Sequence, residues 1–112
     1  MFHHFVWDLF LFTKGHAMVF EFSNEIFYWR GPAPFFFVRM PEEQSQDLQA
    51  ISNLVTYGWG VIPVDVQIGK TKWYTALFPK DGRYLVPLKA DVRKAEHLEE
   101  GELVNVWLKV RE

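Results

Sequence analysis

The sequence predicts a mainly β protein with two short helices, folded as a double-split β-barrel with pseudo-two-fold symmetry in a single chain and capped by the helices. Three observations lead to this fold class. Apolar and polar residues alternate with a period of two in several segments, turn residues separate these segments, and one order of elements occurs twice. A length of 112 residues with 49% hydrophobic residues suits one domain whose core needs no disulfide or structural metal.

The first predicted elements are two strands and a helix. From Val19 to Tyr28 apolar residues alternate with polar ones, as in a half-buried strand, and residues 35–38 form the returning strand after the Gly- and Pro-rich residues 31–34. Pro41 then begins a helix, because proline is tolerated at the first helical position and acidic residues follow it. The apolar stripe of this helix consists of Leu48, Ile51, Leu54 and Val55.

Three more strands follow in the middle of the chain. Residues 62–68 alternate strictly, and the two-residue turn 69–70 leads into a returning strand over residues 72–78. Pro79 to Gly82 is predicted to be a four-residue turn, since proline presets one dihedral angle and glycine accepts a positive φ. Residues 83–88 form the next strand.

A helix over residues 90–97 and a last strand complete a repeated order of elements. Strand, short helix, glycine turn and valine-rich strand occur from Phe36 to Ile68 and again from Tyr84 to Val110. Because neither unit can bury its apolar faces alone, we expect them to pack about a pseudo-two-fold axis. Val66 and Val106 are then expected at related, buried positions.

The N-terminal residues 1–17 are predicted to be an extension outside the core, with the single barrel domain over residues 18–112. Residues 1–17 are apolar but contain an aspartate, and they lack the features of a secretory signal or a membrane helix. Alternatively, Phe5, Leu9 and Phe12 form one stripe of a short helix that docks on the barrel or on a partner. We expect no membrane insertion and a cytoplasmic location.

Short motifs along most of the chain resemble those of a known family. They are Trp29, Phe35 to Val38, Met40-Pro41, Gly69, Leu77-Phe78-Pro79, Gly82, Val86-Pro87-Leu88-Lys89, Val92-Arg93-Lys94 and Gly101 before Val104. With these motifs, residues 19–111 resemble the family known as domain of unknown function 1905. The resemblance implies a double-split β-barrel with capping helices, and it implies no activity, cofactor or catalytic residue. Residues 84–108 are also similar in pattern to the swapped-hairpin barrel of AbrB- and MazE-type DNA-binding proteins, which are dimers.

The distribution of charge is the most informative feature for function. The net charge of −2 argues against a surface built entirely to bind polyanions, but residues 65–94 carry seven basic and three acidic side chains. Because cations beside aromatic rings hold phosphate or an unstacked base, we expect a non-enzymatic binding module for an anionic ligand or nucleic acid. The candidate ligand-binding residues are Lys70, Lys72, Trp73, Lys89, Arg93 and Lys94. Two alternatives remain: these charges only solvate the barrel, or the protein is an accessory domain acting through protein contacts.

No pattern in the sequence indicates catalysis. The absence of cysteine excludes a thiolate zinc site and a cysteine nucleophile. No serine with the glycines of a nucleophile elbow is present for His97 to activate, so His97 is expected to act as a helix-end cation. The segment 69–71 lacks the first glycine of a phosphate loop. Asp65 is expected to pair with Lys70 or Lys72 across the hairpin. We therefore expect no enzyme activity, no cofactor and no metal site.

Overall fold

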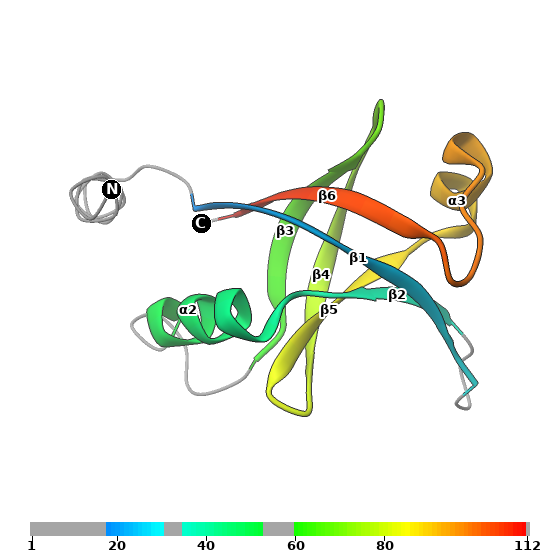
Figure 1. The fold of residues 1–112 in the computed structure, drawn as a ribbon. Helices are drawn as coiled ribbons and strands as arrows, with labels where there is room; N and C mark the ends of the chain where they lie inside the picture. The colour runs from blue at the N-terminus through cyan, green and yellow to red at the C-terminus, as the bar shows by residue number, and fades with distance from the viewer. Residues whose placement is uncertain (1–17, 31–34, 53–59, 112) are drawn as a thin grey trace.

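The computed structural model of the protein describes residues 18–30, 35–52 and 60–111. In these residues, six antiparallel strands form a closed barrel, and two helices lie at its opposite ends (Figure 1). The elements are β1 (Val19–Trp29), β2 (Phe35–Arg39), α2 (Glu42–Ser52), β3 (Ile62–Ile68), β4 (Thr71–Lys80), β5 (Arg83–Leu88), α3 (Ala90–Glu96) and β6 (Leu103–Val110). The predicted fold class is confirmed.

The strand order agrees with the predicted pseudo-two-fold symmetry. The strands follow one another around the barrel as β1-β2-β5-β4-β3-β6. Exchanging β1 with β4, β2 with β5 and β3 with β6 leaves every neighbouring pair unchanged, and α2 and α3 then follow equivalent strands. Val66 and Val106 are both fully buried, and each directly precedes one member of the pair formed by Gln67 and Trp107 between β3 and β6.

The core lies inside the barrel and consists of the apolar residues at alternating positions of the strands. On β3 the residues at even positions are buried, as the strict alternation of this segment predicts, and β6 shows the same pattern. The inward residues of these two strands are Ile62, Val64, Val66, Ile68, Val104, Val106 and Leu108. Leu48 of α2 and Val92 of α3 add to the same cluster. Leu54 and Val55, also predicted on the stripe of α2, lie outside the described residues, as do residues 1–17.

Ser45 connects α2 to the barrel where the chain leaves β2. The Met40 N–H donates to the Tyr84 carbonyl over 2.9 Å. In return, the Tyr84 N–H donates to the Ser45 hydroxyl over 3.1 Å, and this hydroxyl donates to the Met40 carbonyl over 3.3 Å. The hydroxyl thus takes the place of the next hydrogen bond between β2 and β5. It is fully buried, so no water competes for these partners.

The turn between β4 and β5 is shorter than the four residues predicted, so the predicted length was wrong. β4 continues through Pro79 and Lys80, with Pro79 paired to Tyr84, and only Asp81 and Gly82 form the turn. Both turn residues have positive φ, at 52° and 76°. Two-residue hairpin turns prefer positive φ at both positions because this matches the twist of the strands, and this preference outweighs the turn tendency of proline.

Neither α2 nor α3, the helices of the described part, is long and apolar enough to cross a membrane.

Candidate functional site

The first candidate site lies on the outer surface of the sheet formed by β4, β3 and β6. The inward residues of β3 belong to the core, so the odd-numbered positions of β3 point outward. The pairing of the three strands places outward residues in two rows across the sheet. The rows are Lys72–Gln67–Trp107 and Tyr74–Asp65–Lys109.

These side chains surround a surface hollow of about 370 Å³, which we name the outer hollow. Its lining residues are Asp65, Lys72, Trp73, Tyr74, Trp107 and Lys109. Tyr74 is 51% exposed, whereas Trp73 is half-buried and packs against the barrel core. The ring open to a ligand is therefore that of Tyr74, next to the predicted Trp73.

An ion pair controls the charge of the outer hollow. The Arg111 Nε donates to both Asp65 carboxylate oxygens over 3.2 and 3.1 Å, and the Arg111 Nη2 donates to Oδ1 over 2.9 Å. The hydrogen bond from Arg111 holds the pKa of Asp65 below its usual value, against desolvation, with help from the charges of Arg111, Lys109 and Lys72. The guanidinium also lies 4.4 Å from the centre of the Tyr74 ring. With Arg111 paired to Asp65, the charges of the lining residues Lys72 and Lys109 leave a net charge of +2 at the outer hollow.

The predicted pairing of Asp65 with Lys70 or Lys72 was wrong, since the partner is Arg111. Arg111 directly follows β6, the second neighbour of β3, so only the strand order brings it to Asp65. A planar guanidinium binds both oxygens of a carboxylate, which a lysine ammonium does not do in the same way.

Three of the predicted basic residues, Lys70, Lys89 and Lys94, lie away from the outer hollow. Lys70 is exposed in the turn between β3 and β4, and its backbone N–H donates to the Glu96 carboxylate over 3.3 Å. The Thr71 hydroxyl donates to the same carboxylate over 2.6 Å, so Glu96 ties α3 to this turn. Lys89 is exposed just before α3, and Lys94 is exposed on α3.

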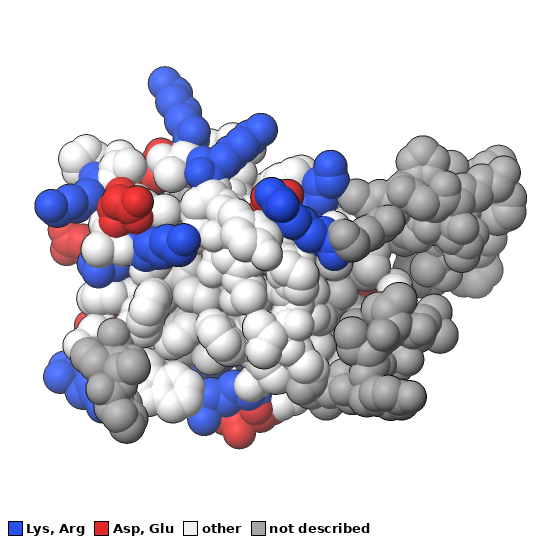
Figure 2. Space-filling model, turned by 180° about the vertical axis from the view of Figure 1, so that it is seen from behind, with Lys and Arg blue, Asp and Glu red and all other residues white. Residues whose placement is uncertain are grey.

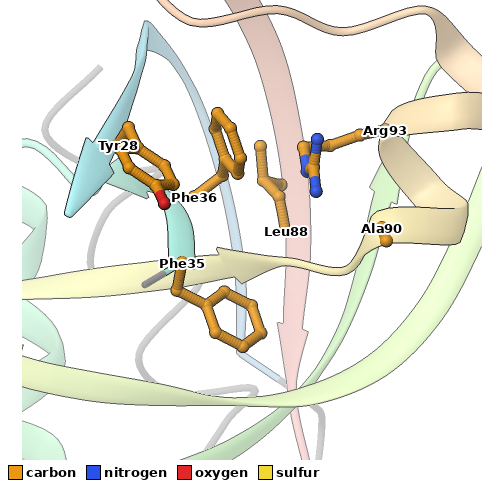
Figure 3. Close-up of a pocket in the computed structure, with 6 residues that line it drawn as sticks. All are labelled: Tyr28, Phe35, Phe36, Leu88, Ala90 and Arg93. Atoms are coloured by element: carbon orange, nitrogen blue, oxygen red, sulfur yellow. The ribbon is translucent and has the colours of Figure 1, made fainter. Parts of the chain in front are cut away.

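Arg93 lines a second pocket of about 310 Å³, which we name the barrel-end pocket (Figure 3). Its other lining residues are Tyr28, Phe35, Phe36, Leu88 and Ala90. The structure thus divides the predicted residues: Lys72 and Trp73 line one hollow, and Arg93 lines another. Figure 2 shows one face of the molecule, where Lys and Arg lie in separate groups around a broad uncharged area.

Sequence reasoning missed Trp107 and Lys109 of the outer hollow and also Arg111, the partner of Asp65. The alternation of β6 is a signal that residues 107 and 109 point outward, because their neighbours are core valines and leucines. No local signal shows that β6 pairs with β3, and this pairing is what brings the three residues to Lys72.

A third feature is an apolar patch on the outside of β1, β2, β5 and β4, which we name the exterior patch. The ring centre of Phe37 lies 5.9 Å from that of Phe27 and 5.6 Å from that of Phe35. Leu85 is 2% exposed although it lies outside the barrel core, and its partner Phe78 on β4 is 45% exposed. The exterior patch therefore leaves Phe35 and Phe78 open to contact.

The described residues contain no group of three or more histidine or acidic side chains that fits a metal ion. Their fold and surfaces define a small closed β-barrel protein with two capping helices. The chain belongs to the family described as domain of unknown function (DUF1905), whose sequence model matches residues 22–108. This match confirms the family resemblance predicted from the motifs. A search of curated proteins found no match.

Proposed function

We propose that the protein is a non-enzymatic binding module and that its outer hollow binds single-stranded nucleic acid. The observation that carries the proposal is the exposed ring of Tyr74 in a hollow that Trp107, Lys72 and Lys109 also line. An aromatic ring stacks on a nucleobase, and adjacent ammonium groups attract the phosphates.

The polar groups of the outer hollow favour binding over catalysis. Asp65 is its only acidic lining residue, and Arg111 engages both oxygens of this carboxylate. A carboxylate with a lowered pKa and occupied oxygens is a weak general base. Because Arg111 neutralises Asp65, the charges of Lys72 and Lys109 remain for a ligand.

The test is fluorescence anisotropy with a labelled twelve-residue oligothymidylate at several salt concentrations. If Lys72 and Lys109 each neutralise one phosphate, the logarithm of affinity falls with the logarithm of salt with a slope of about −1.4, from about −0.7 per contact on single strands. Replacing both, Lys72→Gln with Lys109→Gln, abolishes this slope. Tyr74→Ala weakens binding by about 1–3 kcal/mol through lost stacking.

The matched control is Lys80→Gln, which removes one positive charge at the other end of β4 from Lys72. This variant is expected to bind as the wild type does. Equal affinity of the wild type and the Lys72→Gln, Lys109→Gln double variant would refute the proposal, as would a loss of the same size in Lys80→Gln.

The exterior patch favours a second candidate function, contact with a protein partner. Exposed aromatic residues in a largely apolar area mark such contacts, and here the Arg39 guanidinium borders them, 4.1 Å from the centre of the Phe27 ring. A pulldown from lysate with and without nuclease separates the two candidates, because nuclease abolishes retention through nucleic acid. Retention that survives nuclease and disappears in Phe78→Asp supports the protein contact.

A further inference from the structure

The interior of the barrel opens into the barrel-end pocket near α3. Two rows of inward-facing side chains cross β1, β2 and β5 at this end: the buried row Ile26–Val38–Val86 and then the row Tyr28–Phe36–Leu88. In the second row, Tyr28 and Phe36 are only half-buried, and their ring centres lie 4.7 Å apart. The barrel-end pocket is therefore an apolar and aromatic continuation of the core that its own side chains leave partly open.

One cation reaches into this apolar pocket. Figure 3 shows the Arg93 side chain extending from α3 toward Phe36 and Leu88. Its guanidinium carbon lies 3.9 Å from the centre of the Phe36 ring, so stacking holds the group in place. The Arg93 Nε is buried and has no hydrogen-bond partner among the described residues. A donor in this position is costly to desolvate without an acceptor.

The acidic residues of α3 are engaged elsewhere. Glu96, one turn beyond Arg93, accepts hydrogen bonds from the Thr71 hydroxyl and the Lys70 N–H. Asp91 accepts a hydrogen bond from the adjacent backbone N–H of the helix. No carboxylate lines the barrel-end pocket, and no ion pair of the described residues includes Arg93.

We propose that the barrel-end pocket binds a small aromatic carboxylate, with its ring against Tyr28 and Phe36 and its carboxylate on Arg93. A single guanidinium matches a carboxylate with two parallel hydrogen bonds. The volume of about 310 Å³ lies at the lower end of the range for small-molecule sites, which suits a ligand of one or two rings. Arg93 is the only Lys or Arg among the lining residues, and the Arg30 guanidinium, 5.3 Å from the centre of the Tyr28 ring, lies next to the pocket. This site is separate from the outer hollow, and either proposal stands without the other.

The experiment is a titration of the ¹⁵N-labelled full chain with 2-naphthoate, followed by backbone NMR shifts. The neutral 2-naphthamide and inorganic phosphate are the comparison probes. Saturable shifts at Phe36, Leu88 and Ala90 are expected with 2-naphthoate, and binding of the amide or of phosphate is expected to be at least tenfold weaker, because neither pairs a planar monoanion with Arg93. Titration extends to about 5 mM, since a ligand of this size binds weakly even in a well-formed site.

Arg93→Gln is expected to weaken 2-naphthoate binding at least tenfold, whereas Lys94→Gln, which removes an exposed charge one residue along α3, leaves it unchanged. Ala90→Leu fills the pocket from α3 without touching the cation, and it abolishes binding even if Arg93→Gln fails to fold. The proposal is overturned if no saturable shifts appear, if the amide binds equally well, or if Ala90→Leu leaves binding unchanged. Shifts confined to Tyr74 and Trp107 also overturn it, and they would assign small anions to the outer hollow.

Discussion

Ser45→Ala tests how the barrel continues past the end of β2. The substitution deletes the hydroxyl that joins the Tyr84 N–H to the Met40 carbonyl. The Met40 carbonyl keeps the Arg83 Nε as a donor at 3.0 Å, but the Tyr84 N–H loses the partner it has in the wild type. A buried hydrogen bond contributes about 1 kcal/mol, and an unsatisfied buried donor costs about 1–3 kcal/mol. We therefore expect a loss of about 2 kcal/mol in the free energy of unfolding.

The assay is urea unfolding followed by circular dichroism, together with a thermal melt. A loss of about 2 kcal/mol corresponds to a fall in Tm of about 8 °C for a domain of this length, with an unchanged slope in urea. The matched control is Ser23→Ala, because the Ser23 hydroxyl is exposed and donates to Asn105 over 2.9 Å. This control is expected to change the stability by less than about 0.5 kcal/mol. If Ser45→Ala is as stable as Ser23→Ala, the bridging role of the Ser45 hydroxyl is refuted.

Two further predictions concern the core and the ion pair. Val66→Ala and Val106→Ala each lower the free energy of unfolding by about 2 kcal/mol through lost burial and a cavity, whereas Val61→Ala, at a 55% exposed position, has little effect in the same urea assay. A small effect of either core variant would contradict the pseudo-symmetric packing. Asp65 has a lowered folded-state pKa, so its contribution is present above its unfolded pKa of about 3.9 and is lost as the pH falls through the folded pKa. At pH 7 we therefore expect the wild type to be more stable than Asp65→Asn, and we expect this difference to vanish in strong acid. A constant difference from pH 7 to pH 2 would rule out the ion pair as its cause.

Local patterns in the sequence predicted most of the individual elements. The alternation of residues 62–68 places Val64 and Val66 inside the barrel, because successive side chains of a strand point to opposite faces. The position of the turn before Arg83 follows from Asp81 and Gly82, although its length does not, since the twist of the paired strands selects the two-residue form. These features depend on residues close in the chain, so the sequence alone determines them.

The candidate sites depended on contacts between distant residues. Because β6 pairs with β3, Asp65 forms its ion pair with Arg111 and not with a lysine of its own hairpin. The same pairing places Trp107 in the hollow that Lys72 lines. Arg93 does not lie with the other predicted basic residues, because its side chain extends from α3 toward Phe36 at the end of the barrel.

The sequence by itself determined which residues of each strand point inward, where the chain turns and where the helices begin, since backbone geometry and local periodicity decide these features. Only the tertiary structure decided which outward and end-facing residues meet. The closure of the barrel pairs strands that lie far apart in the chain, as β1 and β6 do from Val19 with Lys109 to Glu25 with Leu103. That choice depends on how all the apolar faces are buried at once, which is a property of the whole chain and not of any one segment.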